Sequence, residues 1–123
     1  MSESNITIAA TFPDIKEAQK VEAIMNDLYE LTKNDDMPFH QYLESKKLTK
    51  GMSFPEPSWW IPEKVERKEN VLNLRLIGSP SGYCEEEPER EDDVVVWLRL
   101  CGAENITGEL VISGGGDVEV VQL

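Results

Sequence analysis

Acidic residues are concentrated in one short stretch, residues 85–93, which has the clearest potential for chemistry in this chain. Its carboxylates could attract a cluster of Lys and Arg on another protein, or hold a divalent cation weakly. The stretch lacks the ligand spacing and central glycine of an EF-hand loop, so we do not expect a dedicated calcium site. A solvated loop is the simpler alternative to a docking site. The residues that the docking hypothesis assigns to attraction are Glu85, Glu86, Glu87, Glu91, Asp92 and Asp93.

Two adjacent tryptophans, Trp59 and Trp60, lie in the segment 51–62, which also contains three prolines. The prolines exclude a regular helix and favour an extended or turning chain. Neighbouring side chains of an extended chain point to opposite sides, so one tryptophan could be buried while the other is exposed. Because tryptophan is over-represented at binding hot spots, Trp59 or Trp60 is a candidate anchor for a partner. The alternative is that both fill the edge of the core.

Residues suited to catalysis are few. The single histidine, His40, could form a thiolate pair with Cys84 or Cys101, or an acid–base pair with Glu44 one helical turn away. Nothing in the sequence brings His40 near either cysteine. Two cysteines and one histidine also lack the close paired spacing of a structural zinc site. We therefore expect no catalytic set, no metal and no cofactor.

Net charge limits the classes of partner. Acids outnumber bases 24 to 12, which gives a net charge of −12. Direct binding to nucleic acid or to an anionic membrane surface is disfavoured, whereas a basic protein partner is favoured. Acidity also simply keeps many proteins dispersed. The N-terminus has no signal-peptide pattern and the two cysteines are expected to be free thiols, so we predict a cytoplasmic protein.

A long amphipathic helix is predicted over residues 14–33. Asp14 followed by Glu17 forms a D-x-x-E capping box at its start. Apolar residues recur every three or four positions, as on one side of a helix. They are Ile15, Ala18, Val21, Ile24, Met25, Leu28 and Leu31. A shorter helix is expected within residues 39–48.

Strands are predicted at both ends of the chain. Alternating apolar residues predict strands at 5–11, 71–77, 108–113 and 118–122, and the charged residues 62–70 are expected at the rim of a strand or in a hairpin. The most hydrophobic stretch, residues 94–101, is predicted to be a central strand because apolar residues occupy both of its sides. The glycine run 114–116 is a hairpin turn and not a phosphate-binding loop, since a strand pattern follows it.

The predicted architecture is a single α+β domain over residues 1–123. Short connections between the later strands require antiparallel pairing. We expect a mostly antiparallel sheet of about five strands, with the long N-terminal helix packed on one face.

Three functions remain open at this point. The first is a small acidic cytoplasmic protein-binding module, of the inhibitor or immunity type, that engages a basic protein surface. The alternative is a small-molecule-binding or catalytic domain with a pocket between helix and sheet, where His40, Tyr42, Cys84 and Trp97 would be the first residues to consider. The third is a homodimer that pairs through an edge strand at residues 118–122.

Overall fold

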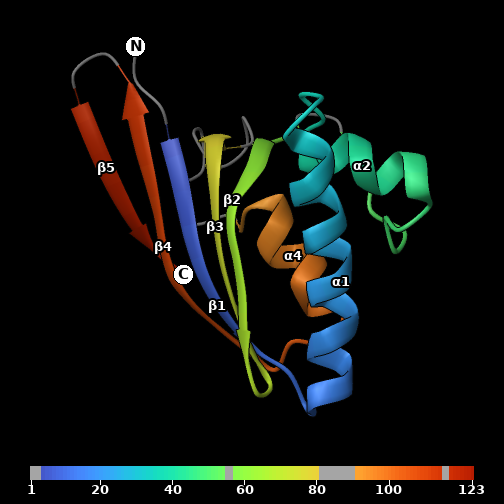
Figure 1. Cartoon of the computed structure of the whole chain (residues 1–123). Helices are drawn as coiled ribbons and strands as arrows, with labels where there is room; N and C mark the ends of the chain where they lie inside the picture. The colour runs from blue at the N-terminus through green and yellow to red at the C-terminus, as the bar shows by residue number, and fades with distance from the viewer. Residues whose placement is uncertain (1–3, 55–56, 81–90, 115–116) are drawn as a thin grey trace.

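The strands form one antiparallel sheet with helices packed on one side of it, as the computed structural model shows (Figure 1). The structure describes residues 4–54, 57–80, 91–114 and 117–123. Its elements are β1 (Ser4–Thr11), α1 (Ile15–Thr32), α2 (Phe39–Lys46), β2 (Trp59–Lys68), β3 (Val71–Ser79), α4 (Asp93–Leu100), β4 (Asn105–Gly114) and β5 (Asp117–Gln122). The predicted α+β fold class is confirmed.

The sheet has the strand order β2-β3-β1-β4-β5. β1, α1 and β2 form one strand–helix–strand unit, and β3, α4 and β4 form a second. Each unit leaves a gap between its strands that a strand of the other unit fills, which is the split βαβ arrangement of ferredoxin-like folds. β5 then extends the sheet by pairing with β4, and Gly114 lies opposite Asp117 across the hairpin. This arrangement defines the fold but not the function.

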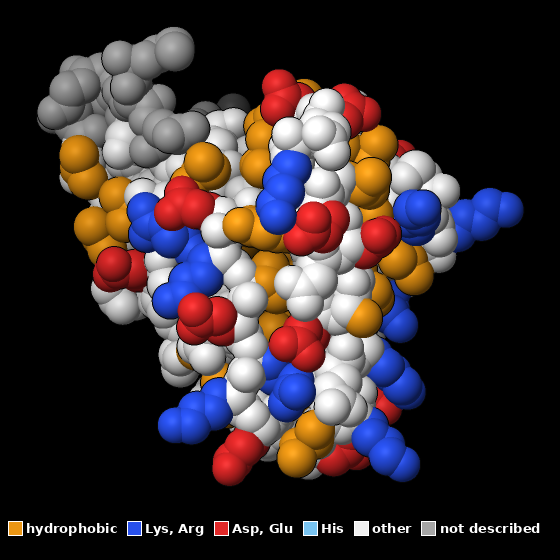
Figure 2. Space-filling model, viewed as in Figure 1, with side chains coloured by type: hydrophobic (Ala, Val, Ile, Leu, Met, Phe, Trp, Pro, Cys, Tyr) orange, Lys and Arg blue, Asp and Glu red, His pale blue; other side chains and the backbone are white. Residues whose placement is uncertain are grey.

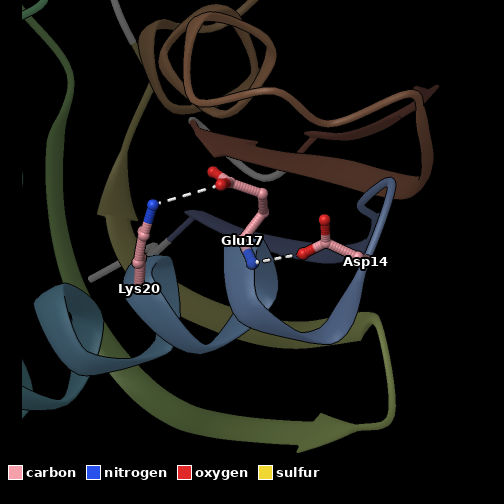
Figure 3. A network of polar contacts seen from close by, with 3 residues as sticks. All are labelled: Asp14, Glu17 and Lys20. Atoms are coloured by element: carbon pink, nitrogen blue, oxygen red, sulfur yellow. Dashed lines mark hydrogen bonds and ion pairs between the residues drawn. The ribbon is translucent and has the colours of Figure 1, made fainter.

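Helix α1 begins where the sequence predicts. Asp14 Oδ1 accepts a hydrogen bond from the Glu17 amide at 2.9 Å, and the Glu17 carboxylate accepts from Lys20 Nζ at 3.1 Å (Figure 3). Glu17 thus bonds to Lys20 and not back to the Asp14 amide, so only one half of the predicted capping box forms. The middle of the predicted apolar stripe is buried, whereas Ile15 and Leu31 at its two ends are exposed.

The core lies between the sheet and the helices. The inward residues of β1 and β3 alternate as predicted and are buried: Ile6, Ile8 and Ala10 in β1, and Leu72, Leu74 and Leu76 in β3. α1 packs mainly on β2. α2 and α4 enclose the same core, where the rings of Phe39 and Trp97 meet edge to face at 5.3 Å between centroids. The described helices α1, α2 and α4 therefore cover the same face of the sheet (Figure 1).

The prediction of a central strand at residues 94–101 is wrong, because this stretch forms α4. Asp92 caps the helix by accepting from the Val94 amide at 3.1 Å, and Arg99 lies in the last turn, where a cation complements the helix dipole. A short apolar run is compatible with a buried helix as well as a buried strand. In this chain the cap from Asp92 favours the helix over the strand. The fifth strand is instead β2, which includes most of the charged stretch 62–70.

Candidate functional site

The face of the sheet opposite the helices is not covered by any described element (Figure 1). Alternate residues of each strand point to this uncovered face, because successive side chains of a strand point to opposite sides. In β1 they are Asn5, Thr7, Ala9 and Thr11. The strand register then fixes which side chains stand beside them on the neighbouring strands.

A row of mostly apolar side chains, here called the apolar band, crosses the uncovered face from one edge of the sheet to the other, with the polar Asn5 at its centre. One row of register partners contains Ile61, Ile77, Asn5, Val111 and Val120, in the order of the strands. Trp59 and Val118 lie at the two ends of the next row and add apolar surface at the two edges, whereas their register partners Ser79 and Ser113 are polar. The exposed fractions are 44% for Trp59, 67% for Val118 and 52% for Val120. Figure 2 shows hydrophobic side chains gathered along the edge of the molecule formed by β5.

A shallow depression of about 560 Å³ lies beside the band on the same face. Thr7, Ala9 and Asn73 line it, with the longer Lys64 and Arg75 at its side. Both cations have acidic partners: Arg75 Nε is 3.1 Å from Glu63 Oε1, and Lys64 Nζ is 3.5 Å from Glu66 Oε2. The depression therefore does not offer unpaired positive charge to an anion.

Close packing of two strands beneath this face depends on Gly108. Its φ is +133°, and a Cβ there would lie 1.9 Å from the carbonyl oxygen of Thr7. Only a glycine allows β4 to approach β1 this closely.

The predicted acidic docking residues are only partly within the described structure. Glu85, Glu86 and Glu87 lie outside the described residues. Glu91 is exposed and forms an ion pair with Arg99. The docking hypothesis for this stretch stays a prediction, and one of its described carboxylates is matched by the protein's own arginine.

Asp92 is a buried structural residue, only 2% exposed. Its Oδ1 accepts from the indole Nε1 of Trp60 at 2.8 Å, and Ser58 Oγ lies 3.1 Å from its Oδ2. Asp93 joins the cluster by accepting from the Ser58 amide at 3.0 Å. Burial raises the pKa of Asp92, while its hydrogen bonds from Val94 and Trp60 oppose that shift. These contacts tie the start of β2 to the start of α4 and leave little of Asp92 to meet a partner.

The two tryptophans point to opposite sides of β2, as alternation in an extended chain requires. Trp60 is fully buried against the core, whereas Trp59 is exposed at the β2 edge of the sheet. Trp59 is therefore the member of the pair that can act as an anchor. The ring of His40, in α2, lies 6.2 Å from the Trp59 ring between centroids, so one side of this indole contacts the helix layer. His40 Nδ1 lies 3.1 Å from the carbonyl oxygen of Ser58.

The residues considered for a pocket between helix and sheet have structural contacts instead. The Tyr42 hydroxyl donates to Asp27 Oδ2 at 2.5 Å, and burial together with this bond raises the tyrosine pKa. Trp97 Nε1 donates to the carbonyl oxygen of Leu48 at 2.8 Å. Cys84 lies outside the described residues. In the described part of the chain, the space between helices and sheet is filled by buried apolar side chains.

Cys101 is a half-buried free thiol at the end of α4. Burial raises its pKa to about 11, and Glu17 adds to this shift, while Lys50 opposes it. A thiol with this pKa is a poor nucleophile at neutral pH. No contact joins Cys101 to His40 in the parts of the chain that are described.

No group of three or more His, Cys, Asp or Glu side chains is placed to hold a metal ion in residues 4–54, 57–80, 91–114 and 117–123. No helix over those ranges is both long and apolar enough to span a bilayer.

The apolar band is the feature that the sequence prediction missed. Its signal was present as adjacent apolar pairs, such as Leu76 with Ile77 and Leu110 with Val111. Strict alternation would have placed a polar residue at the second position of each pair. Comparison with protein families, curated proteins and solved structures finds no significant match. The structure by itself defines an α+β domain with the split βαβ strand order, one added strand and one sheet face that no described element covers.

Proposed function

We propose that this protein is a small acidic binding module, of the inhibitor or immunity type, that engages a basic surface of another protein. The observation that carries the proposal is the apolar band, anchored by exposed Trp59, on the uncovered face of a protein with net charge −12. A group of exposed apolar side chains with polar surroundings is typical of an interaction site.

Charge and apolar contact have separate roles in this proposal. Surplus carboxylates speed the approach of a cationic partner, and the desolvated aromatic contact slows its release. Trp59 supplies the largest apolar side chain of the band. The acidic stretch 85–93 contributes to attraction, since it holds much of the surplus charge. We place the protein in the cytoplasm, where the Cys101 thiol stays reduced.

Two other functions receive less support. A small-molecule or catalytic site between helix and sheet has little room, because buried side chains fill that space in the described residues. A homodimer through residues 118–122 is geometrically allowed, since β5 is an edge strand. Two copies of a −12 protein repel each other, which disfavours that assembly.

Affinity capture from the native lysate tests the proposal. Immobilised wild-type protein should retain a basic protein at about 50 mM salt and less of it at about 500 mM, because salt screens exposed charges. Trp59→Ala should weaken binding at least about tenfold if the indole is an anchor. Leu100→Ala is the matched control, because Leu100 is also an exposed large apolar residue, 49% exposed, but lies in α4. Recovery of no basic protein at either salt concentration would refute the proposal.

A further inference from the structure

The two edges of the sheet differ in how well they are protected against an additional strand. β2 carries Pro62, and its register with β3 shifts between Pro62 and Lys64. Proline, an irregular register and charged side chains are the common devices that prevent strand addition. β5 has neither a proline nor an irregular register: its pairing with β4 is regular from end to end. Its charged residues are the acids Asp117 and Glu119, and it contains no lysine or arginine.

The backbone of β5 presents free hydrogen-bonding groups outward. The Leu123 amide donates to the carbonyl oxygen of Gly108 at 3.1 Å, and these two residues continue the register of the β4–β5 pair. In an antiparallel ladder, alternate residues bond to the partner strand and the residues between them point away from it. The N–H and C=O groups of Val118 and Val120 therefore point away from β4, where no described element lies (Figure 1).

The side chains of β5 alternate in chemistry as well as in direction. Val118 and Val120 are exposed at the end of the apolar band on the uncovered face. Glu119 lies on the opposite face and is also exposed. An added strand that matched this pattern would carry apolar side chains on the first face and cations on the second.

Charge also differs between the edges. The described acidic side chains of β4 and β5 are Glu109 and Glu119, and neither strand contains Lys or Arg. Neither glutamate forms an ion pair within the described residues. Near the β2 edge, Lys64 and Arg75 are paired with Glu66 and Glu63. Among the described residues of the sheet, the glutamates of β4 and β5 therefore have no ion-pair partner, and negative charge is uncompensated on the β5 side.

We propose that the partner docks through an extended segment of alternating apolar and Lys/Arg residues, which adds to β5 as a sixth strand. The inference rests on the proposed function and names the part of the partner that is bound. Main-chain hydrogen bonds supply affinity in this mode of recognition, and side-chain alternation supplies specificity. A second copy of the chain fits the edge less well, because pairing centred on Glu119 would place two carboxylates opposite each other.

A labelled synthetic peptide tests the inference by fluorescence anisotropy. The probe is a peptide of about ten residues that alternates valine and lysine, which is long enough to form one strand. The comparison peptide has the same composition, with the valines and lysines in two separate blocks. The wild-type protein should bind the alternating peptide at least about tenfold more tightly, since only that order places all cations on one face of a strand.

Three variants of the protein locate the bound peptide. Val120→Pro removes an outward amide without breaking the β4–β5 ladder and should lower affinity at least about tenfold. Val120→Thr keeps the amide and should lower affinity only a few fold, which makes it the matched control. Glu119→Lys should also weaken binding. Thermal melting followed by circular dichroism checks that each of the three variants remains folded.

The outcomes separate this inference from the proposed function. Equal binding of the two peptides, or unchanged affinity in Val120→Pro, would overturn strand addition. If Trp59→Ala nevertheless abolished capture of the basic protein, that protein would lie across the uncovered face and not along β5. The proposed function would then stand without strand addition. A dimer of the wild-type protein in sedimentation, converted to monomer by Val120→Pro, would also overturn the inference, because a second copy would then occupy the edge.

Discussion

Replacing Asp92 by alanine should destabilise the protein substantially, although the change removes a buried charge. The carboxylate caps α4 through the Val94 amide and accepts from the indole N–H of Trp60 at 2.8 Å. Loss of a helix cap costs about 1 kcal/mol, and an orphaned buried donor costs about 1–3 kcal/mol. Ser58 keeps an acceptor in Asp93. Because alanine also relieves the desolvation of a charge, we expect a net loss of about 2–3 kcal/mol in the free energy of unfolding.

A double-mutant cycle isolates the bond between the carboxylate and the indole. Trp60→Phe removes the donor and leaves most of the aromatic volume, so the double variant no longer contains an orphaned N–H. The two changes should therefore cost about 1 kcal/mol less together than the sum of their separate costs. Urea denaturation followed by far-ultraviolet circular dichroism measures all four free energies. Additivity within about 0.3 kcal/mol would refute the reasoning.

The pH dependence of the same comparison gives a second check. Burial raises the pKa of Asp92, so the folded protein binds this proton more tightly than the unfolded chain does. The contribution of Asp92 to stability therefore grows as pH falls from 7 and is smallest above its folded pKa. The stability difference between wild type and Asp92→Ala should increase on acidification, and a decrease would contradict the assignment.

Three further predictions concern other parts of the fold. In a Cys84→Ser background, Cys101 should react with iodoacetamide about 100-fold more slowly at pH 8 than a thiol with the usual pKa of 9.0, because its pKa is about 11. Denaturant should restore the ordinary rate. Gly108→Ala should lower the melting temperature far more than Gly102→Ala, since both have positive φ but only Gly108 would clash with a neighbouring strand. Leu28→Ala should cost about 2–5 kcal/mol in denaturant titrations, because Leu28 is fully buried on the inner side of α1.

Much of the architecture could be predicted from periodicity alone. The buried stripe of α1 and the alternation of Leu72, Leu74 and Leu76 follow from the spacing of apolar residues. The opposite directions of Trp59 and Trp60 follow from extended geometry in the same way. In each case the local spacing of apolar residues was sufficient to predict which side chains are buried, because only one face of the element is buried.

Helix α4 and the apolar band could not be obtained from periodicity. The run that begins at Val94 is apolar on every side, so period two and period 3.6 fit it equally well. Asp92, which caps the helix, is itself held by Ser58 and Trp60, and these two residues lie more than thirty positions away from it along the chain. The band likewise depends on register, since Ile77 and Val111 meet the same neighbour, Asn5, only after β1 has paired on both sides.

The irregular β2 edge has a consequence for stoichiometry. A sheet with two unprotected edges can grow without limit, because each added molecule exposes another unpaired edge strand. Fibres form in this way. Here Pro62 and the neighbouring register shift interrupt the ladder at one end. A partner strand can therefore add at β5 but not at the opposite edge. The complexes formed should be finite, with one partner strand bound to each copy of the domain.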